Sequence, residues 1–184
     1  MAGHVGDEPT ARRLLADADG GVRAAALGAL GRMARLTDDD LVTALGDADA
    51  GVRRRAVALA IPRTGVALVP VLADPEPDVA EQGAWACGER QPPEAGAVAA
   101  LAALATGHDD ALVREAAVAA LGAIGDPAGL PAVLAATTDK PAVRRRAVLA
   151  LAPFDGDEVE AALQRALSDR DWQVRQAAED LLGS

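Results

Sequence analysis

Apolar residues recur along the chain with the period of an α-helix, and no segment shows the alternation of a β-strand. After Val52, for example, apolar residues return at Ala56, Val57, Leu59 and Ala60. This spacing places one apolar stripe on each helix. The pattern therefore predicts an all-α protein.

One short phrase occurs six times along the sequence. An acidic residue is followed by two others, a valine and an arginine, and then by an alanine-rich apolar stretch, with substitutions in some copies. The six valines are Val22, Val52, Val79, Val113, Val143 and Val174. They are 30, 27, 34, 30 and 31 residues apart. Repeats of this length indicate a solenoid, whose helical hairpins bury their apolar faces by stacking on one another.

Each repeat is expected to hold two helices. The acidic residue three positions before the valine is a favourable N-cap for the second helix. The first helices are expected at about 8–16, 38–46, 65–73, 94–106, 127–136 and 156–167. We predict one domain over residues 1–184, a right-handed α–α superhelix of about six hairpins. Its approximate repeats are 7–35, 36–63, 64–91, 92–125, 126–154 and 155–184.

Composition agrees with a stack of hairpins and narrows the partners. Alanine supplies 46 of the 184 residues, which allows close helix packing with only 2% aromatic residues. The net charge of −10 disfavours generic binding to nucleic acid or to an anionic membrane. There is no long apolar run and no secretory signal at the start, and the single cysteine suits a reducing compartment. A cytoplasmic protein is expected.

The repeated phrases resemble HEAT-like repeats of the short, phycobilisome-lyase type. The clearest stretch runs from Val113-Arg114 through Leu121-Gly122 to Gly125-Asp126-Pro127, and the resemblance covers nearly the whole chain. It implies an α-solenoid but no single function, since such repeats serve scaffolds, assembly factors and a few enzymes. The third repeat departs most, with Ala80 in place of the arginine.

The resemblance also implies a structural role for the repeated arginines, as an ion-pair ladder with carboxylates of adjacent repeats. The arginines are Arg23, Arg53, Arg114, Arg144 and Arg175, and the expected carboxylates are Asp17, Asp47, Asp74 and Asp169. Arginine suits such pairs because its guanidinium group binds a carboxylate through two hydrogen bonds.

In stacks of this type the second helices line the concave face, which makes their outward positions the candidate binding surface. Those residues are Arg54, Arg55, Glu81, Trp85, Glu89, Glu115, Arg145 and Arg146. Trp85 would be the anchor, with the arginines facing acidic groups and the glutamates facing basic ones. The alternative is an ordinary solvated face, with Trp85 folded onto a neighbouring helix.

Other reactive residue types favour structural roles. Trp172 is expected to cover the end of the apolar core, and Cys87 to be a small core residue. His108 is expected in a polar cap turn, and His4 lies near the start of the chain. Two histidines, one cysteine and two serines support no catalytic triad, and no metal-ligand spacing or phosphate loop is present.

The expected function is a non-catalytic scaffold that binds a protein or peptide on the concave face, without a cofactor. The alternative is an enzyme or nucleic-acid-processing protein that uses the same groove, as HEAT-like DNA glycosylases do. A phycobilin lyase rests on the name of the repeat alone. A further alternative is an accessory subunit whose last helix, Val174–Leu182, docks onto a partner. The oligomeric state stays open.

Overall fold

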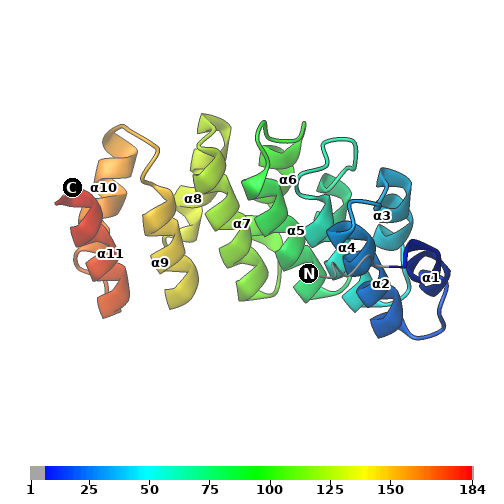
Figure 1. The fold of residues 1–184 in the computed structure, drawn as a ribbon. Coiled ribbons are helices and arrows are strands. Elements are labelled where there is room, and N and C mark those ends of the chain that lie inside the picture. Colours follow the sequence, from blue (N-terminus) through cyan, green and yellow to red (C-terminus); the bar gives the residue numbers. More distant parts are fainter. Residues whose placement is uncertain (1–6, 184) are drawn as a thin grey trace, which may run out of the picture. The chain divides into compact units, whose positions relative to one another are not determined.

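The computed structural model describes residues 7–183, which are entirely helical apart from turns and loops. The α-helices are α1 (Glu8–Leu14), α2 (Gly20–Arg32), α3 (Asp38–Leu45), α4 (Ala50–Ala60), α5 (Pro77–Glu89), α6 (Ala97–Gly107), α7 (Ala111–Ile124), α8 (Leu130–Ala136), α9 (Pro141–Ala150), α10 (Asp157–Ala166) and α11 (Trp172–Leu182). Two 3₁₀ helices complete the set, η1 (Val69–Ala73) and η2 (Pro127–Gly129). The prediction of an all-α solenoid is confirmed (Figure 1).

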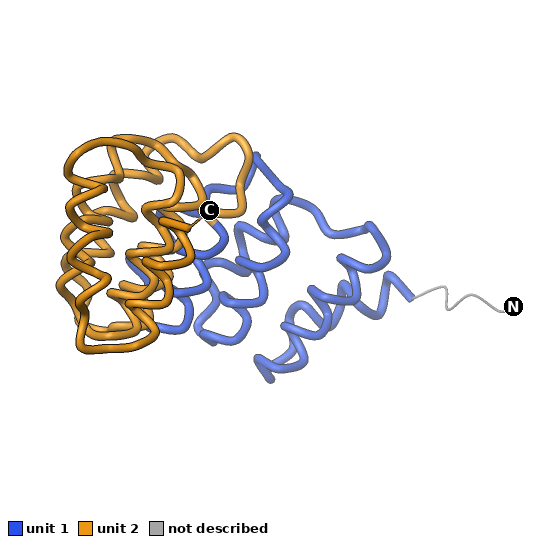
Figure 2. The backbone as a smooth tube through the Cα atoms, turned by 90° about the vertical axis from the view of Figure 1, so that its left-hand side faces the viewer, with its two compact units in different colours: residues 1–86 blue, residues 87–184 orange. Residues whose placement is uncertain are grey.

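The chain divides into two compact units, residues 1–86 and 87–184 (Figure 2). In unit 1, the first helices α1 and α3 pack on the second helices α2 and α4, and α2 packs beside α4. In unit 2, α7, α9 and α11 form the corresponding row of second helices, with α6, α8 and α10 packed on them. One domain over residues 1–184 stays a prediction.

The repeated phrase starts the second helices as its chemistry predicts. The side chains of Asp19, Asp49, Asp110 and Asp171 each accept a hydrogen bond from a backbone N–H in the first turn. The phrase valine is buried in five repeats and half-buried, as Val22, in the first. Four second helices therefore begin at a side-chain cap, and their apolar faces enter the core.

The first elements of the third and fifth repeats differ from the expected helices. The segment 65–73 contains only η1, because Pro70 removes a helical hydrogen bond and Pro75 follows closely. The segment 127–136 is split into η2 and α8. In these two repeats the first helix is shortened by proline while the second keeps its full length.

The arginine ladder joins consecutive hairpins within each unit. Arg53 donates from Nε and Nη2 to the two carboxylate oxygens of Asp74, at 2.7 and 2.8 Å, and from Nη1 to the Asp47 carbonyl at 2.9 Å. Matching carboxylate pairs are Arg23–Asp47, Arg114–Asp139 and Arg144–Asp169. Each arginine therefore binds its own turn and the next repeat together.

Two members of the expected ladder have other partners, and one carboxylate of the ladder was not among those expected. Asp139 pairs with Arg114 and was not among the expected carboxylates, because it lies four residues before its valine rather than five. The Asp17 carboxylate accepts the backbone N–H of Asp19. Arg175, in the last repeat, donates to the carbonyl of Asp169. These two terminal residues support the local turn instead of a neighbouring hairpin.

None of the helices within residues 7–183 combines the length and the apolar character needed to span a lipid bilayer.

Candidate functional site

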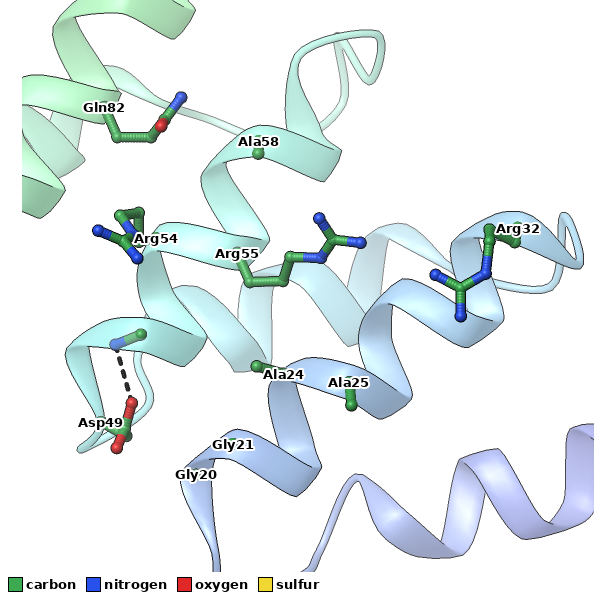
Figure 3. Close-up of a pocket in the computed structure, with 11 residues that line it drawn as sticks. Gly20, Gly21, Ala24, Ala25, Arg32, Asp49, Arg54, Arg55, Ala58 and Gln82 are labelled. Atoms are coloured by element: carbon green, nitrogen blue, oxygen red, sulfur yellow. Dashed lines mark hydrogen bonds between the residues drawn. The ribbon is translucent and has the colours of Figure 1, made fainter.

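A groove of about 630 Å³ runs over the second helices of unit 1 (Figure 3). Its small residues come from α2 and α4. They are Gly20, Gly21, Ala24, Ala25, Gly51 and Ala58. Its polar residues are Arg32, Asp49, Arg54, Arg55 and Gln82, the last from α5. The groove therefore combines a floor of minimal side chains with a strongly polar wall.

The repeat pattern explains how this groove forms. The positions two and three residues after the phrase valine hold Ala24 and Ala25 in the first repeat, and Arg54 and Arg55 in the second. Gln82 occupies the third position after the valine of the next repeat. Equivalent positions of successive hairpins lie on one face of a repeat stack. Small side chains on α2 beside long ones on α4 therefore leave a hollow next to the arginines.

The three arginines of the groove are bound differently. Arg54 lies 3.7 Å from the Asp78 carboxylate, and both side chains are more than half exposed, so that pair is weak. Arg32 and Arg55 are exposed and form no ion pair or hydrogen bond with any residue between 7 and 183. Their guanidinium groups, from α2 and α4, point toward one another (Figure 3).

The one carboxylate that lines the groove is already engaged in structure. Asp49 caps α4, accepting the backbone N–H groups of Gly51 at 2.8 Å and Val52 at 3.2 Å. Its side chain also lies against Gly20, where a Cβ would come within 2.4 Å of it. The groove therefore carries three guanidinium groups against one capping carboxylate, although the whole chain has a net charge of −10.

The remaining predicted site residues of unit 1 lie along α5. The Trp85 side chain is 49% exposed, and Glu81 is half-buried. Trp85 follows Gln82 by three residues, so the two share a face of the helix. Trp85 is therefore available to a partner and lies one turn from the groove, although it does not line it.

In unit 2, the predicted residues separate into a paired set and an exposed one. Arg146 donates to Glu115 at 3.4 Å, so these two residues partly neutralise each other. Arg145 and Glu89 are exposed. Arg145 lines a smaller groove of about 240 Å³ on α9 and α11, together with Trp172.

Two contributors to the grooves were missed or misplaced by the sequence analysis. Trp172 is 64% exposed and does not cover the core, because the first turn of α11 directs it onto the surface of the second helices. Its spacing from Gln176 and Asp180 is helical and was the available signal. Arg32 stands in the last turn of α2, outside the positions compared between repeats.

The remaining candidate reactive groups have structural surroundings. Cys87 is fully buried, and this burial raises the pKa of its thiol to about 11. His108 accepts the backbone N–H of Asp110 on its Nδ1 at 3.0 Å, within a polar turn. His4 lies outside the described residues. Between residues 7 and 183, no three His, Cys, Asp or Glu side chains are grouped to hold a metal ion.

Comparisons with known proteins agree with this repeat architecture. A family model for HEAT repeats matches residues 66–152, and one for the PBS lyase HEAT-like repeat matches residues 143–169. A search of the curated proteins found no match.

Several solved structures of similar fold are engineered or designed proteins. An engineered protein aligns over 97% of this chain and 98% of its own, with a TM-score of 0.70 and 22% identity. A designed armadillo repeat protein in complex with the peptide (KR)4 aligns over 97% and 99%, with a TM-score of 0.69 and 20% identity. Computationally designed armadillo repeat proteins for modular peptide recognition align over 96% of this chain and 99% of their own, with a TM-score of 0.66 and 20% identity. Residues 66–169 therefore consist of HEAT-like repeats, and the chain has an armadillo-like α-solenoid fold.

Proposed function

We propose that this chain is a non-catalytic interaction module that binds a protein or peptide on the surface of its second helices. The groove of unit 1 carries this proposal, because it is open, lined by second helices and floored by glycine and alanine. Small residues let a peptide main chain approach closely, while the arginines and Gln82 offer hydrogen-bond donors to it. A designed armadillo repeat protein of the same fold is bound to the peptide (KR)4, which supports a peptide ligand here.

The lining of the groove favours binding over catalysis. It contains no histidine, cysteine, serine or lysine, and its carboxylate caps a helix. A general base must reach its proton within hydrogen-bond distance, and a nucleophile needs such a base beside it. The groove offers donors and small surfaces instead. We therefore take the interaction module over the enzyme.

Selection from a random-peptide display library on the purified chain tests this function. Peptides should be enriched, and their binding should be lost in Ala25→Trp, where a large side chain fills the groove from an exposed position on α2. Ala103→Trp, at an exposed position on α6, is the matched control and should bind normally.

Two results would overturn the proposed function. One is a selection without enriched peptides, and the other is binding that Ala25→Trp leaves intact. A duplex oligonucleotide that binds near physiological ionic strength, with the salt dependence typical of phosphate contacts, would favour the nucleic-acid alternative instead.

A further inference from the structure

We infer that the groove of unit 1 binds an acidic segment of a partner protein, with side-chain carboxylates of that segment paired to Arg55 and Arg32. This inference rests on the proposed function and adds the chemistry of the ligand. It starts from two exposed guanidinium groups that point toward each other and have no partner between residues 7 and 183. Like charges that face each other repel, and a carboxylate placed between them replaces repulsion with two charge-assisted hydrogen bonds.

Arg55 already packs against α2 before any ligand arrives. Its guanidinium group lies against the backbone of α2 at Gly28, where an added Cβ would stand 2.5 Å from Nη2 and 3.2 Å from Nε. Gly28 is buried, so the glycine makes a shelf on which the planar group rests. A side chain that already has its bound position loses less conformational freedom on binding.

The positive charge of the groove contrasts with the net charge of the whole chain. With 28 acidic and 18 basic residues, the net charge of the chain repels an acidic segment. In the groove, Arg54 shares its charge with Asp78, the Asp49 carboxylate caps a helix, and Arg32 and Arg55 have no ion pair within residues 7–183. The charge of the groove is therefore opposite in sign to that of the whole chain. An acidic segment of a partner would be attracted to the groove and bind there.

The shape favours a peptide over a small anion or a duplex. A floor that includes Ala24, Ala25 and Ala58 extends beyond the arginines to Gln82, whose amide can both donate to and accept from a peptide bond. A lone anion would use only the guanidinium groups and leave this floor empty. Duplex nucleic acid binds through many phosphates along an extended cationic surface, which an acidic chain does not supply.

Fluorescence anisotropy with labelled peptides of equal length tests the inference on the full chain. The probes alternate serine with glutamate, glutamine or lysine. We expect the glutamate peptide to bind at least about tenfold more tightly than the other two at low ionic strength. The double variant Arg32→Glu with Arg55→Glu should lower the affinity for the glutamate peptide by about tenfold or more. The double variant Arg32→Gln with Arg55→Gln should lower it by less.

The matched control changes the same charge elsewhere in unit 1. Arg13→Glu with Arg35→Glu alters two exposed arginines that do not line the groove, and should leave the affinity for the glutamate peptide within about twofold. Circular dichroism checks that every variant is folded. An equal loss in both double variants would show that net charge, and not this site, attracts the peptide.

Several results would overturn the inference. These are equal affinity for the glutamate and glutamine peptides, unchanged binding after the reversal of Arg32 and Arg55, displacement of the peptide by submillimolar inorganic phosphate, or tighter binding of a duplex oligonucleotide through the same arginines. If display selection enriches neutral or basic peptides that Ala25→Trp blocks, the inference fails while the proposed function stands. If it enriches none, the proposed function itself fails.

Discussion

The guanidinium group of Arg55, on α4, packs against Gly28 of α2. If residue 28 carried a Cβ atom, that atom would lie only 2.5 Å from Nη2 of Arg55. The three atoms nearest to this Cβ position all belong to the end of the Arg55 side chain. A methyl group at residue 28 would therefore meet a movable group and not the backbone. The position of a charged side chain in the groove thus depends on the absence of one carbon atom on the neighbouring helix.

Gly28→Ala should separate stability from binding. Alanine in a helix interior is favoured over glycine by about 0.8 kcal/mol, and Arg55 can move aside, so we expect urea unfolding to show equal or higher stability. Because the guanidinium group is displaced, the affinity for the glutamate peptide, measured by fluorescence anisotropy, should fall by about threefold. Gly31→Ala, which meets Leu59 and not Arg55, is the control and should keep the affinity. A variant with unchanged affinity would show that the shelf is irrelevant.

Gly122→Ala should have the opposite effect on stability. A Cβ there would come within 2.7 Å of both Cα and Cβ of Ala150, where α7 and α9 pack with almost no space between their backbones. The helices must separate, which we expect to cost about 2 kcal/mol of unfolding free energy in spite of alanine's helix propensity. Gly107→Ala, with open space at that position, should cost nothing. A neutral Gly122→Ala would mean that the stack yields easily.

Arg53→Ala should lower the unfolding free energy by about 2 kcal/mol, because the Asp74 carboxylate and the Asp47 carbonyl would lose a hydrogen-bond donor. The side chains of Arg53 and Asp74 are only 12% and 9% exposed, so water replaces that donor poorly. Arg53→Lys should recover only part of this loss, because an ammonium group keeps the charge but cannot make the bidentate pair. Arg54→Ala, at the adjacent exposed residue, is the control and should change the unfolding free energy by less than about 0.5 kcal/mol.

Acid should destabilise the folded chain through the same ladder. Hydrogen bonds from Arg23, Arg53, Arg114 and Arg144 lower the pKa values of Asp47, Asp74, Asp139 and Asp169 below the ordinary value of 3.8. A carboxyl group with a lowered pKa in the folded state stabilises the fold above its unfolded pKa, and this stability is lost as pH falls through the folded pKa. Urea midpoints should therefore stay level from pH 7 to about 5 and fall below about pH 4. Asp74→Asn should show a shallower fall, and an equal slope would contradict this role.

Trp85→Ala should reduce the capture of display-selected peptides without loss of helicity. Trp85 is 49% exposed and one turn from Gln82, so it can cover the end of a bound peptide while contributing little to the core. Helicity by circular dichroism should match the original chain. Trp172→Ala, which removes another exposed tryptophan from the smaller groove of unit 2, is the comparison. If Trp85→Ala binds normally, Trp85 is an ordinary solvated residue.

Helix starts, core valines and turns followed from local rules. An aspartate three residues before each valine caps its helix wherever it occurs, because the bond forms within a few residues of sequence. The first helix of the third repeat was overestimated because Pro70 within this short apolar segment, with Pro75 close behind it, permits only a 3₁₀ turn. The pairing of Asp139 with Arg114 was not predicted, because Asp139 lies one residue closer to its valine than the other carboxylates do. The flexible arginine side chain still reaches it.

By itself, the sequence determined the helical class, the repeat period and the residues on the outer positions of the second helices, since periodicity and capping act over a few residues. Only the tertiary structure decided that Arg32 faces Arg55, that one guanidinium group packs against Gly28, that Arg146 is paired with Glu115, and that Trp172 lies on the surface. These relations join residues of different helices or depend on the space between helices. They follow from how closely two backbones approach, which is set by packing and not by local pattern.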